Sequence, residues 1–330
     1  MADLPWIDAD AAMLVGRTVL PGGPPITRRA AERVVAGLRR AAGRSEQYVE
    51  EVTQLGVQAA GPVRIVDRLT WLGLNIDMTQ QLLARVGTVA EPRGLPQRLG
   101  SRWHGAQLGG ALAILGARIL GQWLPFLAMP QLVLVAPNIA VTETALRVRP
   151  TDFRLWVCLH EQTHRMQFAR APWLADHLLV ELSQLLDEGP RRPLADRARP
   201  GGRGPWRLMD TVLTRDQQVV FDRVSAVMSL LEGYAEDMMD RVGPQVIPTV
   251  ATIRSRFDAR RNQGGLGAMV SRALGSDLKL AQYREGARFC RAVVGRVGVP
   301  GLNAVYEGPD HFPTPAELAD PDVWVRRIHG

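Results

Sequence analysis

The sequence contains very little lysine and very little cysteine. Lys279 is the only lysine among 40 basic residues, so the net charge of +7 is carried almost entirely by arginine. A bias of this kind is typical of a GC-rich genome and does not by itself indicate a surface that binds polyanions. The two cysteines, Cys158 and Cys290, are too few for a disulfide framework, which excludes the class of small disulfide-stabilised secreted proteins.

The sequence also lacks a long uncharged apolar run. The best candidate, residues 105–126, contains Arg118 and two glutamines, and glycine or alanine recurs at positions 105, 109, 113 and 117. This spacing allows close helix packing, and the charge favours a buried helix over a membrane span. The first ten residues are acidic and do not resemble a signal peptide. We therefore expect a cytoplasmic protein that has no membrane partner.

Helical periodicity dominates the rest of the chain. The pattern predicts helices at about 27–42, 62–87, 150–171 and 215–242, and a strand at 131–139. We expect a single mainly α domain with a small β component. Its three parts would be an N-terminal helical part at about 1–125, a core at about 126–245 and a C-terminal helical part at about 246–330. Residues 188–206 are rich in Pro, Gly and Arg, which favours a solvated surface loop over a site for an anionic ligand.

Two histidines four residues apart indicate a metal site. His160 and His164 lie one helical turn apart on the same face, so both imidazoles can bind one ion. Glu161 lies about 100° around the helix, where its carboxylate can accept a proton from a water molecule on the metal. The surrounding residues are apolar, so these three polar side chains would be costly to bury without an ion. The alternative is a polar helix face that carries His, Glu and His by chance.

A catalytic zinc site needs a third protein ligand. The class of site with a third histidine on the same helix requires Gly at 167 and His at 170, and this chain has Gln167 and Arg170. That class is therefore excluded, and the third ligand must come from another helix.

Three residues compete for the third position. His177 and Glu181 lie on a further helix that the pattern predicts at about 173–187. Glu232 interrupts an otherwise apolar helical face, and binding a cation would offset the cost of burying its carboxylate. The alternative for Glu232 is an ion pair with an arginine.

Several neighbours of Glu232 are candidates for supporting roles. Gly233 would let the helix that carries Glu232 approach the histidine helix closely. Glu236, Asp237 and Asp240 could accept hydrogen bonds from the ligand imidazoles, although for each of them taken alone a solvated acidic face is the better explanation. Tyr234 and Tyr283 are candidates to stabilise an oxyanion, with ordinary aromatic packing as the alternative for Tyr283.

The strand at 131–139 precedes the histidine helix and has two interpretations. In zincins, an exposed strand above the metal commonly pairs with an extended peptide, and this strand is a candidate for that role. An ordinary core strand fits the sequence equally well.

Residues 153–178 resemble the signature of a family of bacterial zinc metalloproteases, long known as a domain of unknown function and later named zincin-like. Some members carry a label of association with deazaflavin-coenzyme biosynthesis, which indicates no particular reaction. Similarity to the family extends over most of the chain, in blocks at 105–123, 132–139, 230–244, 278–294 and 321–327.

The resemblance implies a zincin-like core with additional helices and assigns roles to particular residues. It implies that His160 and His164 are metal ligands, that Glu161 is the base and that Glu232 is the third ligand. This chain departs from the family at Tyr234, where members usually have histidine. A phenol can still donate one hydrogen bond, so loss of activity does not follow from this change.

These observations predict a zinc-dependent peptidase of the gluzincin type that acts on a peptide or protein substrate. The main alternative is a scaffold or binding protein that keeps the zinc site without proteolysis. An arginine-rich nucleic-acid binder is a third possibility, and the absence of a recognition motif counts against it.

Overall fold

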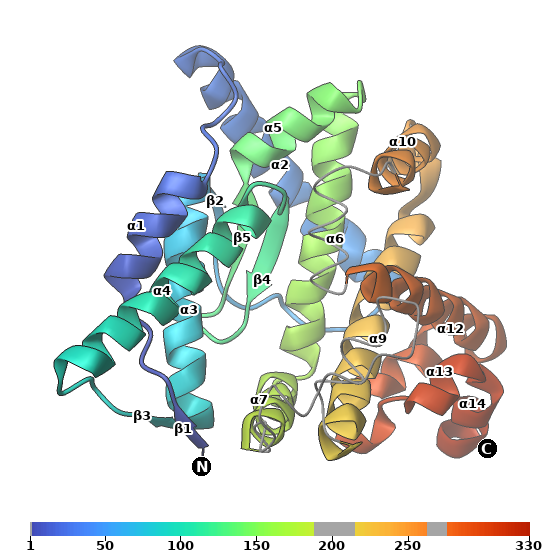
Figure 1. Ribbon diagram of the computed structural model, residues 1–330. Helices are drawn as coiled ribbons and strands as arrows, with labels where there is room; N and C mark the ends of the chain where they lie inside the picture. Colours follow the sequence, from blue (N-terminus) through green and yellow to red (C-terminus); the bar gives the residue numbers. More distant parts are fainter. Residues whose placement is uncertain (1, 188–214, 263–275) are drawn as a thin grey trace. The chain divides into compact units, whose positions relative to one another are not determined.

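The computed structural model describes residues 2–187, 215–262 and 276–330. It is mainly helical with a small sheet, which confirms the expected fold class (Figure 1). The chain divides into two compact units, one formed by residues 3–170 and 238–257 and the other by residues 171–237 and 258–330. The single domain and its three parts stay predictions, and the loop predicted at 188–206 lies outside the described residues.

The first unit contains a three-stranded sheet in the order β2-β5-β4. The strands are β2 (Val63–Val66), β4 (Gly121–Leu124) and β5 (Gln131–Val135). β5 is parallel to β2 and antiparallel to β4, and all five of its residues are buried. The interpretation of this segment as a core strand is therefore confirmed, and its interpretation as an exposed substrate-binding strand is wrong. The strand is also shorter than predicted, because α5 (Ala136–Ala145) begins at Ala136 with Pro137 in its first turn.

β4 lies between two helices. Alternate residues of a strand point to opposite faces of a sheet. Trp123 of β4 lies 6.3 Å, ring centre to ring centre, from Phe168 of α6 (Pro150–Arg170). On the other face, the Trp71 Nε1 of α3 (Arg68–Val86) donates a hydrogen bond of 2.8 Å to the Gln122 Oε1. Gly121, which alternates with Gln122, therefore faces α6 as Trp123 does.

The glycine-rich segment forms α4 (Leu95–Gly116), which packs against α1 (Ala9–Val19). A Cβ atom on Gly105 or Gly109 of α4 would collide with backbone atoms at Asp8 and Ala12. This close packing is what the small-residue spacing predicts. The helix ends earlier than expected, however, and residues 121–124 form β4 instead. In the described part of the chain, no helix is long and apolar enough to cross a membrane.

The remaining elements of the first unit surround this core. α2 (Arg28–Thr53) begins at Thr27, whose side chain accepts a hydrogen bond from the Ala30 amide as an N-cap. Two short strands, β1 (Ala2–Leu4) and β3 (Gly87–Val89), pair in a separate sheet. α10 (Val250–Asn262) begins in this unit.

The second unit is helical in its described part. It includes α7 (Trp173–Asp187), most of α9 (Arg215–Val246), and α12 (Ser276–Leu302), followed by two short 3-10 helices (Asn303–Tyr306 and Pro309–His311), α13 (Pro315–Ala319) and α14 (Pro321–His329). Gly233 of α9 packs directly on Gly286 of α12, and a Cβ atom on either would collide with the backbone of the other helix. The close approach at Gly233 is therefore made with α12, whereas the sequence had suggested the histidine helix as its partner.

Candidate metal and catalytic site

α6 carries the histidine pair and is held firmly within the first unit. Its first turn contains Asp152, which accepts a hydrogen bond of 2.8 Å from the Thr249 hydroxyl. Near its other end, the Arg165 guanidinium donates to the carbonyls of Ala59 and Ala60, at 3.1 and 2.8 Å respectively. These contacts attach both ends of the histidine helix to the rest of the unit.

The two imidazoles converge on one point. The Nε2 atoms of His160 and His164 lie 3.2 Å apart, and the ring centres lie 4.7 Å apart. Tetrahedral zinc binds nitrogen at 2.0–2.1 Å, which places two ligand nitrogens about 3.3 Å from each other. The separation of the two Nε2 atoms therefore fits two ligands of a single zinc ion.

Gln167 orients one of these rings. Its Oε1 atom lies 2.9 Å from the Nδ1 atom of His164. An amide oxygen only accepts hydrogen bonds, so the proton of a neutral His164 lies on Nδ1 and the lone pair lies on Nε2. This is the tautomer that a metal ion needs at Nε2. In the sequence, Gln167 serves only to exclude a third histidine on the same helix, but its spacing of three residues from His164 also indicates a possible contact.

Glu161 is buried on the same helix, with 8% of its surface exposed. A Cβ atom built on Gly121 of β4 would lie 2.6 Å from the Cγ of Glu161 and 2.7 Å from its Cδ, so the Glu161 side chain packs directly against the strand. Burial, and then the negative charge of Glu161, raise the pKa of the Cys158 thiol well above its usual range. Cys158 is therefore a protonated, buried side chain, as expected, and supplies neither a thiolate ligand nor a nucleophile.

The side chains of His160, His164 and Glu232 are each partly buried. The histidines belong to the first unit and Glu232, on α9, to the second. The role of Glu232 as third ligand stays a prediction.

The competing candidates for the third position have other contacts. Glu181 is buried and forms an ion pair of 2.8 Å with Arg223. His177 packs against the rings of Trp173 and Phe312, whose centres lie 5.9 and 6.1 Å from its own. Both contacts explain these residues without a metal.

The proposed supporting residues are placed as follows. Tyr234 is fully buried, and its hydroxyl donates a hydrogen bond of 2.8 Å to the Asn303 Oδ1. Asp240 forms an ion pair of 2.6 Å with Arg254. Glu236 is partly buried and Asp237 is buried, both on α9. Tyr283 lies within α12, and its side chain is outside the described residues. The catalytic and supporting roles of these residues stay predictions.

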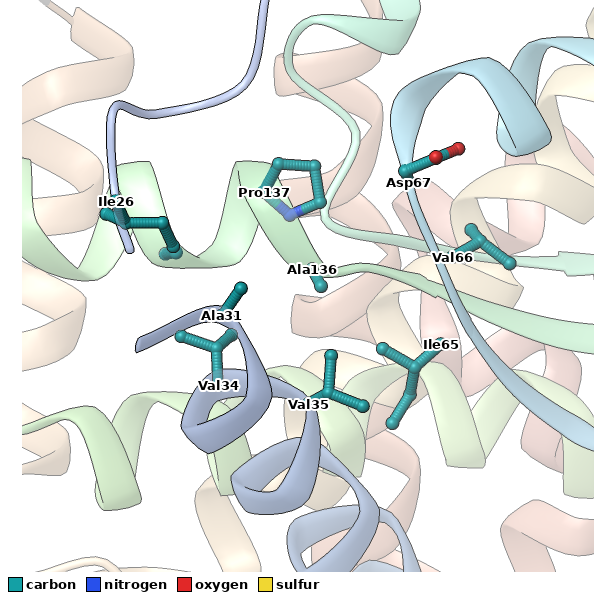
Figure 2. Close-up of a pocket in the computed structure, with 10 residues that line it drawn as sticks. Ile26, Ala31, Val34, Val35, Ile65, Val66, Asp67, Ala136 and Pro137 are labelled. Carbon is teal, nitrogen blue, oxygen red and sulfur yellow. The ribbon is translucent and has the colours of Figure 1, made fainter. Parts of the chain in front are cut away.

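An apolar pocket of about 230 Å³ lies elsewhere in the first unit, between α2, β2 and α5 (Figure 2). Val34, Val35, Ile65 and Pro137 are among its lining residues. Asp67, at its edge, accepts a hydrogen bond of 2.7 Å from the Thr70 amide and so caps α3. None of the candidate catalytic or ligand residues lines this pocket, and its chemistry is limited to apolar contact.

Comparisons with known proteins found a matching family and a similar solved structure. Residues 7–325 match the model of a family described as zincin-like metallopeptidase. The chain is also similar to a crystal structure from Chloroflexus aurantiacus, described as that of a candidate hydrolase with a novel fold. The two share 31% sequence identity over 98% of each chain, with a TM-score of 0.71. A comparison with curated proteins gave no match.

Proposed function

Because the chain belongs to the zincin-like metallopeptidase family, we propose that it is a zinc-dependent peptidase of the gluzincin type. The observation that best supports the proposal is the convergence of the His160 and His164 Nε2 atoms, 3.2 Å apart, on the helix that carries the buried Glu161. A peptide or protein substrate and a cytoplasmic location belong to the same proposal.

In this proposal the metal is held by His160, His164 and Glu232. Two imidazoles and one carboxylate are the donor set of many catalytic zinc sites, which leave the fourth position open. When bound there, zinc supplies a Lewis acid that polarises the scissile carbonyl and lowers the pKa of water toward neutrality. The hydrogen bond from His164 to Gln167 supports this assignment, because it leaves the Nε2 lone pair available.

Glu161 is the general base and then the general acid. Its carboxylate accepts a proton from the attacking water and passes it to the leaving amine. Because Glu161 lies next to His160 on α6 and packs against Gly121 of β4, its carboxylate is positioned before the substrate binds. Tyr234 is the proposed hydrogen-bond donor to the developing oxyanion, and its hydrogen bond to Asn303 would have to be exchanged for that purpose.

We place the substrate along the outer edge of β4. In the described part of the chain, β4 pairs with β5 on one side only. An extended peptide could pair with the other edge of β4 through backbone hydrogen bonds. It would then lie beside the strand whose Gly121 contacts Glu161. This assignment transfers to β4 the role that the sequence had suggested for β5.

The decisive test separates metal binding from hydrolysis. Glu161→Gln removes the base and keeps the size of the side chain, so we expect it to retain stoichiometric zinc and to lose at least about 100-fold in kcat on a cleavable peptide. Zinc content is measured by elemental analysis and turnover with a mixed peptide library. Undiminished turnover in the variant would contradict the mechanism. Stoichiometric zinc without turnover in the wild-type protein would favour the alternative, a zinc-binding scaffold.

A further inference from the structure

We infer that Gly121 of β4 is a positioning residue for the catalytic carboxylate of Glu161. The inference rests on the proposed function and deepens it, because it identifies what fixes the base. Residue 121 belongs to the strand face that packs on α6, and Glu161 is the side chain that occupies the space beside it.

The contact is close and specific. A Cβ atom built on Gly121 would lie 2.6 Å from the Cγ of Glu161, 2.7 Å from its Cδ and 3.0 Å from its Oε1. Its three nearest neighbours all belong to Glu161. Ordinary contact between carbon atoms occurs at about 3.5–4.0 Å, so even the smallest side chain at this position would have to displace the carboxylate by roughly 1 Å.

Backbone conformation does not explain the glycine. The described glycines with positive φ are at positions 56, 61, 243 and 298, and Gly121 is not among them. Its strand conformation is one that any residue adopts. Glycine within a strand is otherwise unfavourable, because it has no side chain to pack and loses more entropy on folding. The space needed by Glu161 is therefore the feature that requires glycine here.

Displacement of the base should affect the chemical step more than any other property. A misplacement of about 1 Å in a catalytic group can reduce turnover by about 100-fold. The three atoms nearest to a Cβ atom at position 121 belong to Glu161 and none of them to a histidine, so metal binding should be preserved. Gly121→Ala is therefore expected to lower kcat by about 100-fold, to change KM by less than about threefold and to retain stoichiometric zinc.

A stability measurement on metal-free protein tests the contact without any assay of activity. Gly121→Ala should lower the Tm by roughly 2–4 °C when Glu161 is present, and should leave it unchanged or raise it when Glu161 is replaced by alanine. The matched control is Gly100→Ala on α4, where an added Cβ meets nothing within 4 Å. The control should give the same change in Tm in both backgrounds. Equal effects of Gly121→Ala in the two backgrounds would overturn the inference.

A double-mutant cycle on turnover tests the positioning role itself. Glu161→Ala removes the base together with the Cγ atom that a Cβ atom at position 121 would meet. Adding Gly121→Ala to this variant should therefore cost less than about threefold in its residual kcat, compared with about 100-fold in the wild-type background. Equal losses in the two backgrounds would contradict positioning. If the wild-type protein hydrolyses no peptide, the proposed function fails, and the Tm measurements still decide whether Gly121 makes room for Glu161.

Discussion

At the scale of single residues, the histidine pair and its glutamate follow from spacing alone. A helix repeats every 3.6 residues, so His160 and His164 had to share a face. The spacing of Gln167 from His164 allows a contact without fixing it, and nothing in the sequence indicates the role of Gly121. The contact of Gln167 depends on a rotamer, and that of Gly121 depends on which strand packs against α6.

The hydrogen bond from His164 to Gln167 leads to a prediction about metal affinity. Gln167→Met keeps the volume of the side chain and removes the acceptor, so the ring of His164 loses its preferred tautomer and orientation. We expect zinc affinity to fall by about 10–100-fold, measured by competition with a chromophoric chelator.

Gln162 provides a matched control on the same helix. It is 1% exposed, and within the described residues neither of its side-chain polar atoms has a hydrogen-bond partner. Gln162→Met should therefore leave zinc affinity unchanged and should not destabilise the protein. Equal losses of affinity in the two variants would show that the effect comes from altered packing of α6 rather than from the orientation of His164.

At the scale of elements, the sequence identifies long helices better than short strands. The predicted end of the helix at residue 242 corresponds to a kink, where Gly243 has a φ of 71° and Pro244 follows it. β4 was missed because its four residues contain one β-branched or aromatic side chain, Trp123, and follow directly on an apolar helical pattern. The position of β5 in the middle of the sheet was equally inaccessible, since it depends on pairing with segments far away in the sequence.

The last two helices, α13 and α14, are joined by a buried ion pair that gives the stability a pH dependence. Glu317 is 4% exposed and accepts hydrogen bonds from Arg327, including one of 2.6 Å, and from the amide of Thr314. Burial alone would raise the pKa of this carboxyl, but the hydrogen bonds from Arg327 and Thr314 and the charge of Arg327 lower it below its ordinary value. The folded state therefore binds the proton less tightly than the unfolded state does.

It follows that Glu317 stabilises the fold above the pKa of the unfolded carboxyl, and that this contribution is lost as pH falls through the folded pKa. Glu317→Gln should lower the free energy of unfolding by about 2 kcal/mol at neutral pH, and this difference should shrink in acid. Thermal unfolding followed between pH 7 and pH 3 measures both effects. Glu307→Gln, on a carboxylate that is 56% exposed, is the control and should change little. A difference that persists unchanged at low pH would contradict the prediction.

At the scale of the whole molecule, blocks of similar sequence spread over the chain indicate the family. The sequence does not indicate the division into two compact units. Helical periodicity is the same in one large domain and in two smaller units, because it reports local structure only. The division falls inside α9, between Asp237 and Met238, where no composition change marks it. The proposed ligand set draws on both units, with two histidines from one and Glu232 from the other.

Zinc should therefore stabilise both units if Glu232 is the third ligand. A ligand at 100 times its Kd stabilises the folded state by about 2.7 kcal/mol, so saturating zinc should raise the Tm by several degrees. Hydrogen exchange should show increased protection in α6 and also in residues 230–237 of α9. Glu232→Gln should remove most of both effects. Glu181→Gln loses the ion pair with Arg223 and should keep the response to zinc, which makes it the control. Protection confined to α6, with an unchanged response in Glu232→Gln, would mean that the third ligand lies elsewhere in the chain.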